Sequence, residues 1–175
     1  CDIRDGDALP MNAIFSQGTS GGLNSGNTIS NNNIYNFSAN GIFVNTGTGN
    51  LDNWVIDGNS FYHTSNFGVA STAQTAINFV PGATSNNNTI SNNIIGGQAP
   101  NGGSLGVAWT STVSNANAFA AIRLSVGSTT ATIVGGNKFQ NMDFLGTNVG
   151  VFGISSGLGK VQIGGTPALA NKMGD

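Results

Sequence analysis

The sequence predicts an all-β solenoid formed by one domain, residues 1–175, and three observations support this fold class. Charged residues make up only 7% of the chain, whereas hydrophobic residues make up 38%. Glycine, asparagine, serine and threonine dominate the remainder, and these residues favour turns. A short motif also recurs along the chain, and a short apolar segment follows each copy. Short apolar strands separated by frequent polar corners account for all three observations.

The recurring motif has the pattern apolar-x-x-Asn-x-apolar. Segment 27–34 returns almost letter for letter as 88–95, and more divergent copies cover 54–61 and 132–139. Because a repeated motif indicates stacked structural units, we expect its apolar residues to form interior columns. The expected columns are Ile29–Ile56–Ile90 and Ile34–Phe61–Ile95–Phe139. The asparagines should stack at one corner as a structural ladder of amide hydrogen bonds; they are Asn32, Asn59, Asn93 and Asn137.

A second short strand is predicted between successive motif copies, where isoleucine or valine follows alanine or glycine. These pairs are Ala13-Ile14, Gly41-Ile42, Ala76-Ile77, Ala121-Ile122 and Gly150-Val151. The stretch from this strand to the next motif varies little in length, whereas the stretch from the motif to this strand varies widely. We therefore predict about five coils with loop insertions at one corner. The two longest insertions, 62–76 and 96–121, follow consecutive copies and should contact each other.

The asparagine-marked corner followed by a Gly-Ile strand resembles the single-stranded, right-handed parallel β-helix of the pectin-lyase-like fold. The resemblance covers residues 1 to about 170 and implies parallel strands stacked about 4.8 Å apart. The low-charge, Asn-, Gly- and Thr-rich style is similar to segments of large bacterial secreted or surface proteins of the adhesin type. The resemblance therefore implies an extracellular or bacterial cell-surface location, and a chain that is a fragment of a longer protein.

The composition excludes several classes of function. Five lysines and arginines in a chain of net charge −2 leave no basic patch for nucleic acid. The sequence contains no run of about 18 apolar residues, the length that a helix needs to cross a membrane. The single cysteine, Cys1, allows neither an internal disulfide nor a Cys-based metal cluster, and we expect no cofactor. No metal site is predicted; the only clustered carboxylates are Asp2, Asp5 and Asp7, which are weak candidates for a Ca²⁺ loop and which we interpret as an exposed acidic turn.

Polysaccharide-cleaving enzymes of the pectin-lyase-like fold provide an alternative function. Their hydrolases combine three aspartates with a Gly-His-Gly and an Arg-Ile-Lys motif. Here the only histidine, His63, lies in the sequence Phe-Tyr-His-Thr, and Arg123 lies in Ile-Arg-Leu, which lacks the lysine. We therefore predict no catalytic residue, and a fragment of a polysaccharide lyase or glycoside hydrolase is the alternative to a binding protein.

Aromatic residues in the two long insertions indicate a binding function. Insertions 62–76 and 96–121 carry Tyr62, His63 and Trp109 among small polar residues. Aromatic faces combined with amide and hydroxyl groups can recognise sugars by stacking and hydrogen bonding. The competing interpretation is that these aromatic side chains pack the insertions against the solenoid. The sequence thus predicts a structural or adhesive segment with a polysaccharide or cell-surface glycan as partner.

Overall fold

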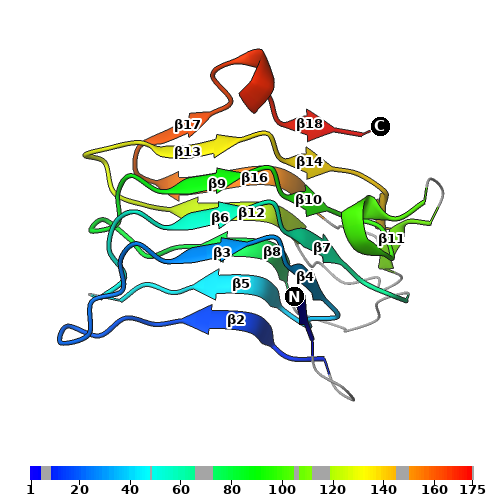
Figure 1. The fold of residues 1–175 in the computed structure, drawn as a ribbon, viewed down its shortest axis with the longest axis horizontal. Helices are drawn as coiled ribbons and strands as arrows, with labels where there is room; N and C mark the ends of the chain where they lie inside the picture. Colours follow the sequence, from blue (N-terminus) through cyan, green and yellow to red (C-terminus); the bar gives the residue numbers. More distant parts are fainter. Residues whose placement is uncertain are drawn as a thin grey trace.

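The computed structural model describes residues 1–4, 9–47, 49–65, 73–104, 107–111, 119–144 and 150–174. In these ranges the fold is all-β, and every pairing between named strands is parallel. Figure 1 shows that equivalent strands lie one above another, such as β3, β6, β9, β13 and β17 from bottom to top. No helix in the described ranges is long and apolar enough to cross a membrane.

Three sheets contain most of the strands. Sheet 1 consists of β2 (Asn12–Ser16), β5 (Asn40–Val44), β8 (Gln74–Phe79), β12 (Phe119–Ser125) and β16 (Val151–Leu158). Sheet 2 consists of β3 (Thr28–Ser30), β6 (Val55–Asp57), β9 (Thr89–Ser91), β13 (Thr132–Gly135) and β17 (Val161–Ile163). Sheet 3 consists of β1 (Asp2–Ile3), β4 (Asn33–Tyr35), β7 (Ser60–Tyr62), β10 (Ile94–Ile95), β14 (Lys138–Phe139) and β18 (Lys172–Met173).

After β1, the chain runs through sheets 1, 2 and 3 in the same order each time. One such passage is called a pass below, and the first is formed by β2, β3 and β4. Each strand pairs with the strand of the same sheet in the neighbouring pass. Equivalent residues of successive passes therefore lie directly above one another, about 4.8 Å apart.

The apolar residues of the motif form columns along sheets 2 and 3, as the repeat predicts. In sheet 3 the register aligns Ile34 with Phe61, Phe61 with Ile95, and Ile95 with Phe139. In sheet 2 it aligns Ile29, Ile56, Ile90 and Val134. Most of these side chains are fully buried and belong to one hydrophobic cluster. Burial of these columns is the main source of stability, since apolar burial is the dominant favourable term in folding.

The turn before each motif asparagine requires a left-handed backbone. The residues there are Asn31, Gly58, Asn92 and Gly136, with φ values of 56°, 66°, 54° and 69°. Glycine adopts this conformation without a steric cost, and asparagine is the residue with a side chain that best tolerates it. The alternation of Asn and Gly at this position thus reflects one backbone requirement that the first four passes share.

The predicted register of the last pass is wrong. The sequence pattern aligns Val151 with the isoleucines of sheet 1, but the structure aligns Ile154 with Ile122. The residue before that isoleucine must be small: a Cβ on Gly41 would lie 2.6 Å from the Ala76 carbonyl oxygen. Gly153 meets this requirement for Ile154, so both Gly150 and Gly153 fitted the sequence pattern and only packing distinguished them.

The connections from sheet 3 to sheet 1 hold the insertions. Two of them contain the additional strands β11 (Trp109–Ser111) and β15 (Met142–Phe144), which pair with each other. The short 3-10 helix η1 (Pro100–Gly102) lies in the same connection as β11. A second 3-10 helix, η2 (Pro167–Leu169), lies between sheets 2 and 3. The long insertions therefore gather at one corner of the stack.

Candidate functional site

The motif asparagines form a continuous hydrogen-bonded column at the corner between sheets 2 and 3. The backbone N–H and the Nδ2 of Asn59 both donate to Oδ1 of Asn93, at 3.0 and 3.1 Å. The same two bonds join Asn32 to Asn59 and Asn93 to Asn137. The second Nδ2 hydrogen of Asn93 is donated to the Ile56 carbonyl oxygen at 3.0 Å. The amide groups therefore hydrogen-bond within the turn and its neighbours, which is a structural role.

A fifth member, Asn171, extends this column and was missed in the sequence. Asn137 donates to Oδ1 of Asn171 from its backbone N–H at 3.0 Å and from Nδ2 at 2.9 Å. The signal was present, because Asn171-Lys172-Met173 repeats the order Asn-Lys-apolar of residues 137–139. The term asparagine ladder is used below for Asn32, Asn59, Asn93, Asn137 and Asn171.

All three residues predicted to bind a ligand are buried, and two of them, His63 and Trp109, lie together. The ring centroids of His63 and Trp109 are 4.6 Å apart. Only 5% of Tyr62, 2% of His63 and 0% of Trp109 is exposed. Burial also lowers the pKa of His63 to about 3 and raises the pKa of Tyr62 to about 12. In this arrangement the rings offer almost no free face on which a sugar could stack.

His63 and Trp109 belong to an aromatic cluster that joins the insertions to the sheets, whereas the Tyr62 ring stacks on Tyr35 of the neighbouring strand at 4.7 Å. Trp109 packs edge-on against Phe37 and Phe119, at centroid distances of 5.7 and 5.2 Å. Hydrogen bonds from backbone N–H groups also attach this insertion to its neighbours: the Trp109 N–H donates to the Asn141 carbonyl at 2.7 Å, and the Asn101 N–H donates to Ser60 Oγ at 2.8 Å. The expected contact between the two insertions is present. The arrangement agrees with the competing interpretation, in which these aromatic residues pack the insertions.

Of the three clustered carboxylates, the structure describes only Asp2. The Asp2 carboxylate accepts a hydrogen bond from Asn33 Nδ2 at 2.8 Å, and Asp5 and Asp7 lie outside the described residues. No group of three or more His, Cys, Asp or Glu side chains positioned to hold a metal occurs in the part of the chain that the structure describes.

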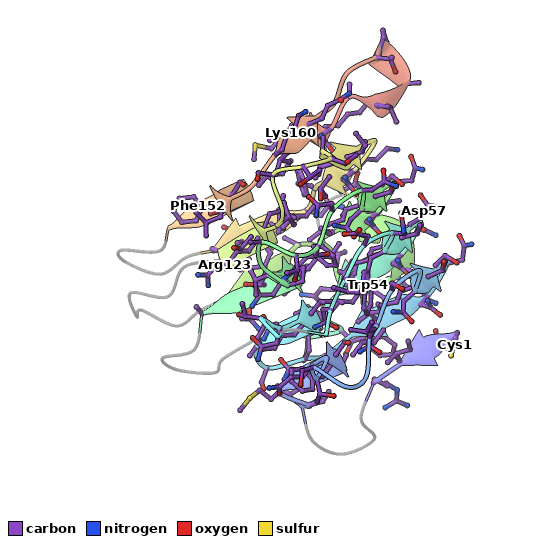
Figure 2. All side chains as sticks on the ribbon, turned by 90° about the vertical axis from the view of Figure 1, so that its left-hand side faces the viewer. Cys1, Trp54, Asp57, Arg123, Phe152 and Lys160 are labelled. Atoms are coloured by element: carbon purple, nitrogen blue, oxygen red, sulfur yellow. The ribbon has the colours of Figure 1, made fainter. Side chains whose placement is uncertain are left out.

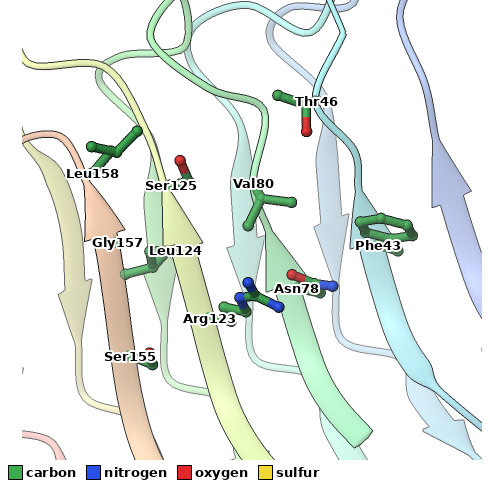
Figure 3. Close-up of a pocket in the computed structure, with 10 residues that line it drawn as sticks. All are labelled: Phe43, Thr46, Asn78, Val80, Arg123, Leu124, Ser125, Ser155, Gly157 and Leu158. Carbon is green, nitrogen blue, oxygen red and sulfur yellow. The ribbon is translucent and has the colours of Figure 1, made fainter. Parts of the chain in front are cut away.

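The outer face of sheet 1 carries a column of unlike side chains. The register aligns Phe15 with Phe43, Phe43 with Asn78, Asn78 with Arg123, and Arg123 with Ser155. The rings of Phe15 and Phe43 are 5.5 Å apart. The guanidinium of Arg123 lies beside Asn78 on this face (Figure 3). An aromatic pair, an amide, a guanidinium and a hydroxyl therefore follow one another across five neighbouring strands.

A groove of about 480 Å³ lies over this column between β5 and β16 (Figure 3). Arg123, Asn78 and Ser155 provide polar groups, and Phe43, Val80 and Leu158 provide apolar surface. None of its lining residues, all of which are described, is acidic. Figure 2 places Arg123 and Asp57 on opposite sides of the molecule. The groove is therefore a cationic and otherwise neutral surface.

Hydrogen bonds set the orientation of Asn78. Its Nδ2 donates to Asn40 Oδ1 at 3.1 Å, and Asn40 Nδ2 donates to Asn12 Oδ1 at 2.7 Å. Oδ1 of Asn78 is buried and has no hydrogen-bond partner among the described residues.

This column was not predicted from the sequence, although the signal was available. In each strand of sheet 1 the residue after the column isoleucine points outward, and in β8 and β12 that residue is Asn78 and Arg123. Comparing the residue that follows the isoleucine in every strand of sheet 1 would have predicted that these side chains adjoin.

The chain matches no family model, no curated protein and no solved structure.

Proposed function

We propose that this chain is a right-handed, single-stranded parallel β-helix of the pectin-lyase-like kind, and that it forms a structural and adhesive segment of an extracellular or bacterial cell-surface protein. The fixed order of the sheets and their parallel pairing support the fold. The asparagine ladder supports the structural role, because it satisfies the groups of a repeated turn without charged residues. The low charge of the sequence and its Asn- and Gly-rich style support the class of protein.

The observation that carries the adhesive part of the proposal is the outer column of sheet 1. Aromatic, amide and hydroxyl groups in a row can hold a sugar by stacking and hydrogen bonding. A polysaccharide repeats along its length, as the strands of sheet 1 repeat along the stack. Successive sugar units could therefore contact successive strands, and we propose a polysaccharide or cell-surface glycan as the partner.

In this proposal the glycan binds a different surface from the insertions 62–76 and 96–121. Tyr62, His63 and Trp109 are buried, and the role of His63 and Trp109 is to hold the insertions against the sheets. Phe43 and Arg123 are accessible on the outer face and take over the role of contacting the ligand.

The alternative function is a fragment of a polysaccharide lyase or glycoside hydrolase. Binding and cleavage are separated by one experiment, in which the protein is incubated with a panel of polysaccharides. Retention of protein on the polysaccharide measures binding, and the release of reducing ends or unsaturated products measures cleavage. Binding without products supports the adhesive segment, and products from the unmodified protein support the enzyme.

A matched pair of variants locates the binding surface. Phe43→Ser should weaken retention at least about threefold, because it removes the ring next to Asn78 on the outer face of sheet 1. Val55→Ser, a change of similar kind in sheet 2, should leave retention unchanged. Equal effects of the two variants, or retention that neither affects, would contradict a binding surface on sheet 1.

A further inference from the structure

We infer that Asn101 is a site of spontaneous deamidation, at which the side-chain amide is lost as ammonia through a cyclic imide, and that Asn40 is protected from this reaction. The inference goes beyond the proposed function and does not depend on it. Asparagine precedes glycine twice in the sequence, at Asn40-Gly41 and at Asn101-Gly102. The two dipeptides are chemically identical, so the fold must account for any difference in their reactivity.

The reaction uses only groups of the chain and water. The backbone nitrogen of the glycine attacks Cγ of the asparagine, so that an N–Cγ bond forms and the Cγ–Nδ2 bond breaks. The proton of the glycine N–H leaves with the amide as ammonia, and a cyclic imide remains. Water then opens the imide at either carbonyl, which gives aspartate or isoaspartate. Glycine favours this reaction because it has no side chain to obstruct the attacking nitrogen.

The fold protects Asn40. It lies in β5, which pairs with β2 on one side and with β8 on the other. Its Nδ2, the group that must leave, donates to Asn12 Oδ1 at 2.7 Å, and its Oδ1 accepts from Asn78 Nδ2 at 3.1 Å. Cyclisation at Asn40 therefore requires sheet 1 to open between two neighbouring strands.

Asn101 is held less firmly. It is exposed and lies in the single turn η1, between β10 and β11. Within the part of the chain that the structure describes, the hydrogen bonds of Asn101 involve its backbone and not its amide group. Its N–H donates to Ser60 Oγ at 2.8 Å, and its carbonyl oxygen accepts from Gln140 Nε2 at 3.4 Å. The amide of Asn101 is therefore exposed to water and free to leave.

A rotation of the backbone sets the rate at Asn101. The residue has a left-handed backbone, with φ 58° and ψ 32°, and its Cα–C bond must turn to bring the Gly102 nitrogen to Cγ. The hydrogen bond that closes the turn joins the Gly103 N–H to the Pro100 carbonyl at 3.2 Å. Opening one surface turn costs less free energy than opening the interior of a sheet. Asn101 should therefore react faster than Asn40.

Deamidation should displace η1 from its neighbours. Gly102 is tightly enclosed, since a Cβ on it would lie 2.1 Å from Gln140 Nε2. Its carbonyl oxygen accepts from Asn141 Nδ2 at 2.7 Å. Isoaspartate adds one carbon to the main chain at this point, and both products carry a carboxylate that is ionised at neutral pH. The contacts of η1 with β7 and with residues 140–141 should therefore loosen in the modified chain.

The test is incubation of the full chain at mildly alkaline pH, followed by peptide mapping with mass spectrometry. The method detects the replacement of an amide NH2 by OH, and chromatography separates aspartate from isoaspartate. Asn101 should react at least about tenfold faster than Asn40 in the folded protein. The denatured chain is the matched control: the two sites should react at similar rates there, because the sheet no longer protects Asn40.

A pair of variants tests whether the opening of η1 sets the rate. Ser60→Ala removes the acceptor of the Asn101 N–H and should speed deamidation of Asn101 at least about threefold, without changing the rate at Asn40. Ser30→Ala, a like change in β3, should leave both rates unchanged. Circular dichroism confirms that each variant is folded.

Three results would overturn the inference. The first is equal rates at Asn101 and Asn40 in the folded protein, and the second is a faster reaction at Asn40. The third is an intact Asn101 in folded protein after a time in which the denatured chain has reacted at both sites. None of these measurements involves a glycan, so they leave the proposed function to its own test.

Discussion

At the corner between sheets 2 and 3 each pass supplies an asparagine, whereas at the corner between sheets 3 and 1 the passes supply insertions of different length and composition. The first corner is held by identical amide hydrogen bonds between neighbouring passes. The second is held by an aromatic cluster that includes His63, Trp109 and Phe119. A repeated corner needs only the same residue at the same position in every pass. An insertion must instead be packed individually, by large side chains that exclude water.

The largest expected effect comes from disrupting the corner between sheets 3 and 1, where the insertions lie. Trp109→Ala should reduce the free energy of unfolding by about 3–5 kcal/mol, because it empties the centre of the aromatic cluster. Chemical denaturation monitored by circular dichroism measures this loss. Trp54→Phe provides the control, since it keeps an aromatic ring near Phe79 and should cost considerably less. A loss below about 1 kcal/mol for Trp109→Ala would show that the insertions are not held by packing.

Acid should weaken the same corner through His63. Its pKa falls from an ordinary 6.5 to about 3 in the fold, because burial disfavours the imidazolium. The unfolded chain therefore binds a proton between these values while the folded chain does not, and stability is lost as the pH falls below 6.5. At pH 4 the loss from His63 should be about 3 kcal/mol relative to pH 7.

The measurement compares denaturation curves of the wild type and His63→Phe at pH 7 and pH 4. The variant lacks the titrating group, so its loss of stability between the two pH values should be smaller by the His63 contribution. If the two proteins lose equal stability, His63 is not held neutral in the folded state.

A smaller effect is expected at the repeated corner. Asn93→Leu should cost about 1–3 kcal/mol, because it removes the acceptor of the Asn59 N–H and the hydrogen bond to the Ile56 carbonyl in a buried turn. Asn171→Leu should cost less, since Asn171 is less buried and has a neighbour on one side only. Thermal unfolding of both variants tests this order. Equal costs would mean that the asparagine ladder does not act as a cooperative column.

The smallest effect belongs to the outer column. Arg123→Gln should change stability by less than about 0.5 kcal/mol, because the side chain is exposed. Its melting temperature should match that of the wild type, measured in the same buffer without glycan. A clear destabilisation would show that Arg123 supports the sheet, and its effect on binding could then be indirect.

Much of the register could be read from the repeat. In a parallel stack, equivalent residues lie above one another, so a motif that recurs also states which residues are neighbours. This reasoning gave the alignment of Ile34, Phe61, Ile95 and Phe139. It failed in the last pass, where Gly150-Val151 and Gly153-Ile154 both fit the pattern and the structure selects the second.

The sequence by itself therefore determined the all-β class, the interior columns and the positions of the asparagines, because each depends on a local pattern repeated at the same place in every pass. The tertiary structure alone decided that Tyr62, His63 and Trp109 are buried, and that Asn78, Arg123 and Ser155 adjoin on one surface. The physical reason is that burial and adjacency depend on which segments cover a side chain. In the insertions and on the outer faces those segments follow no repeated pattern.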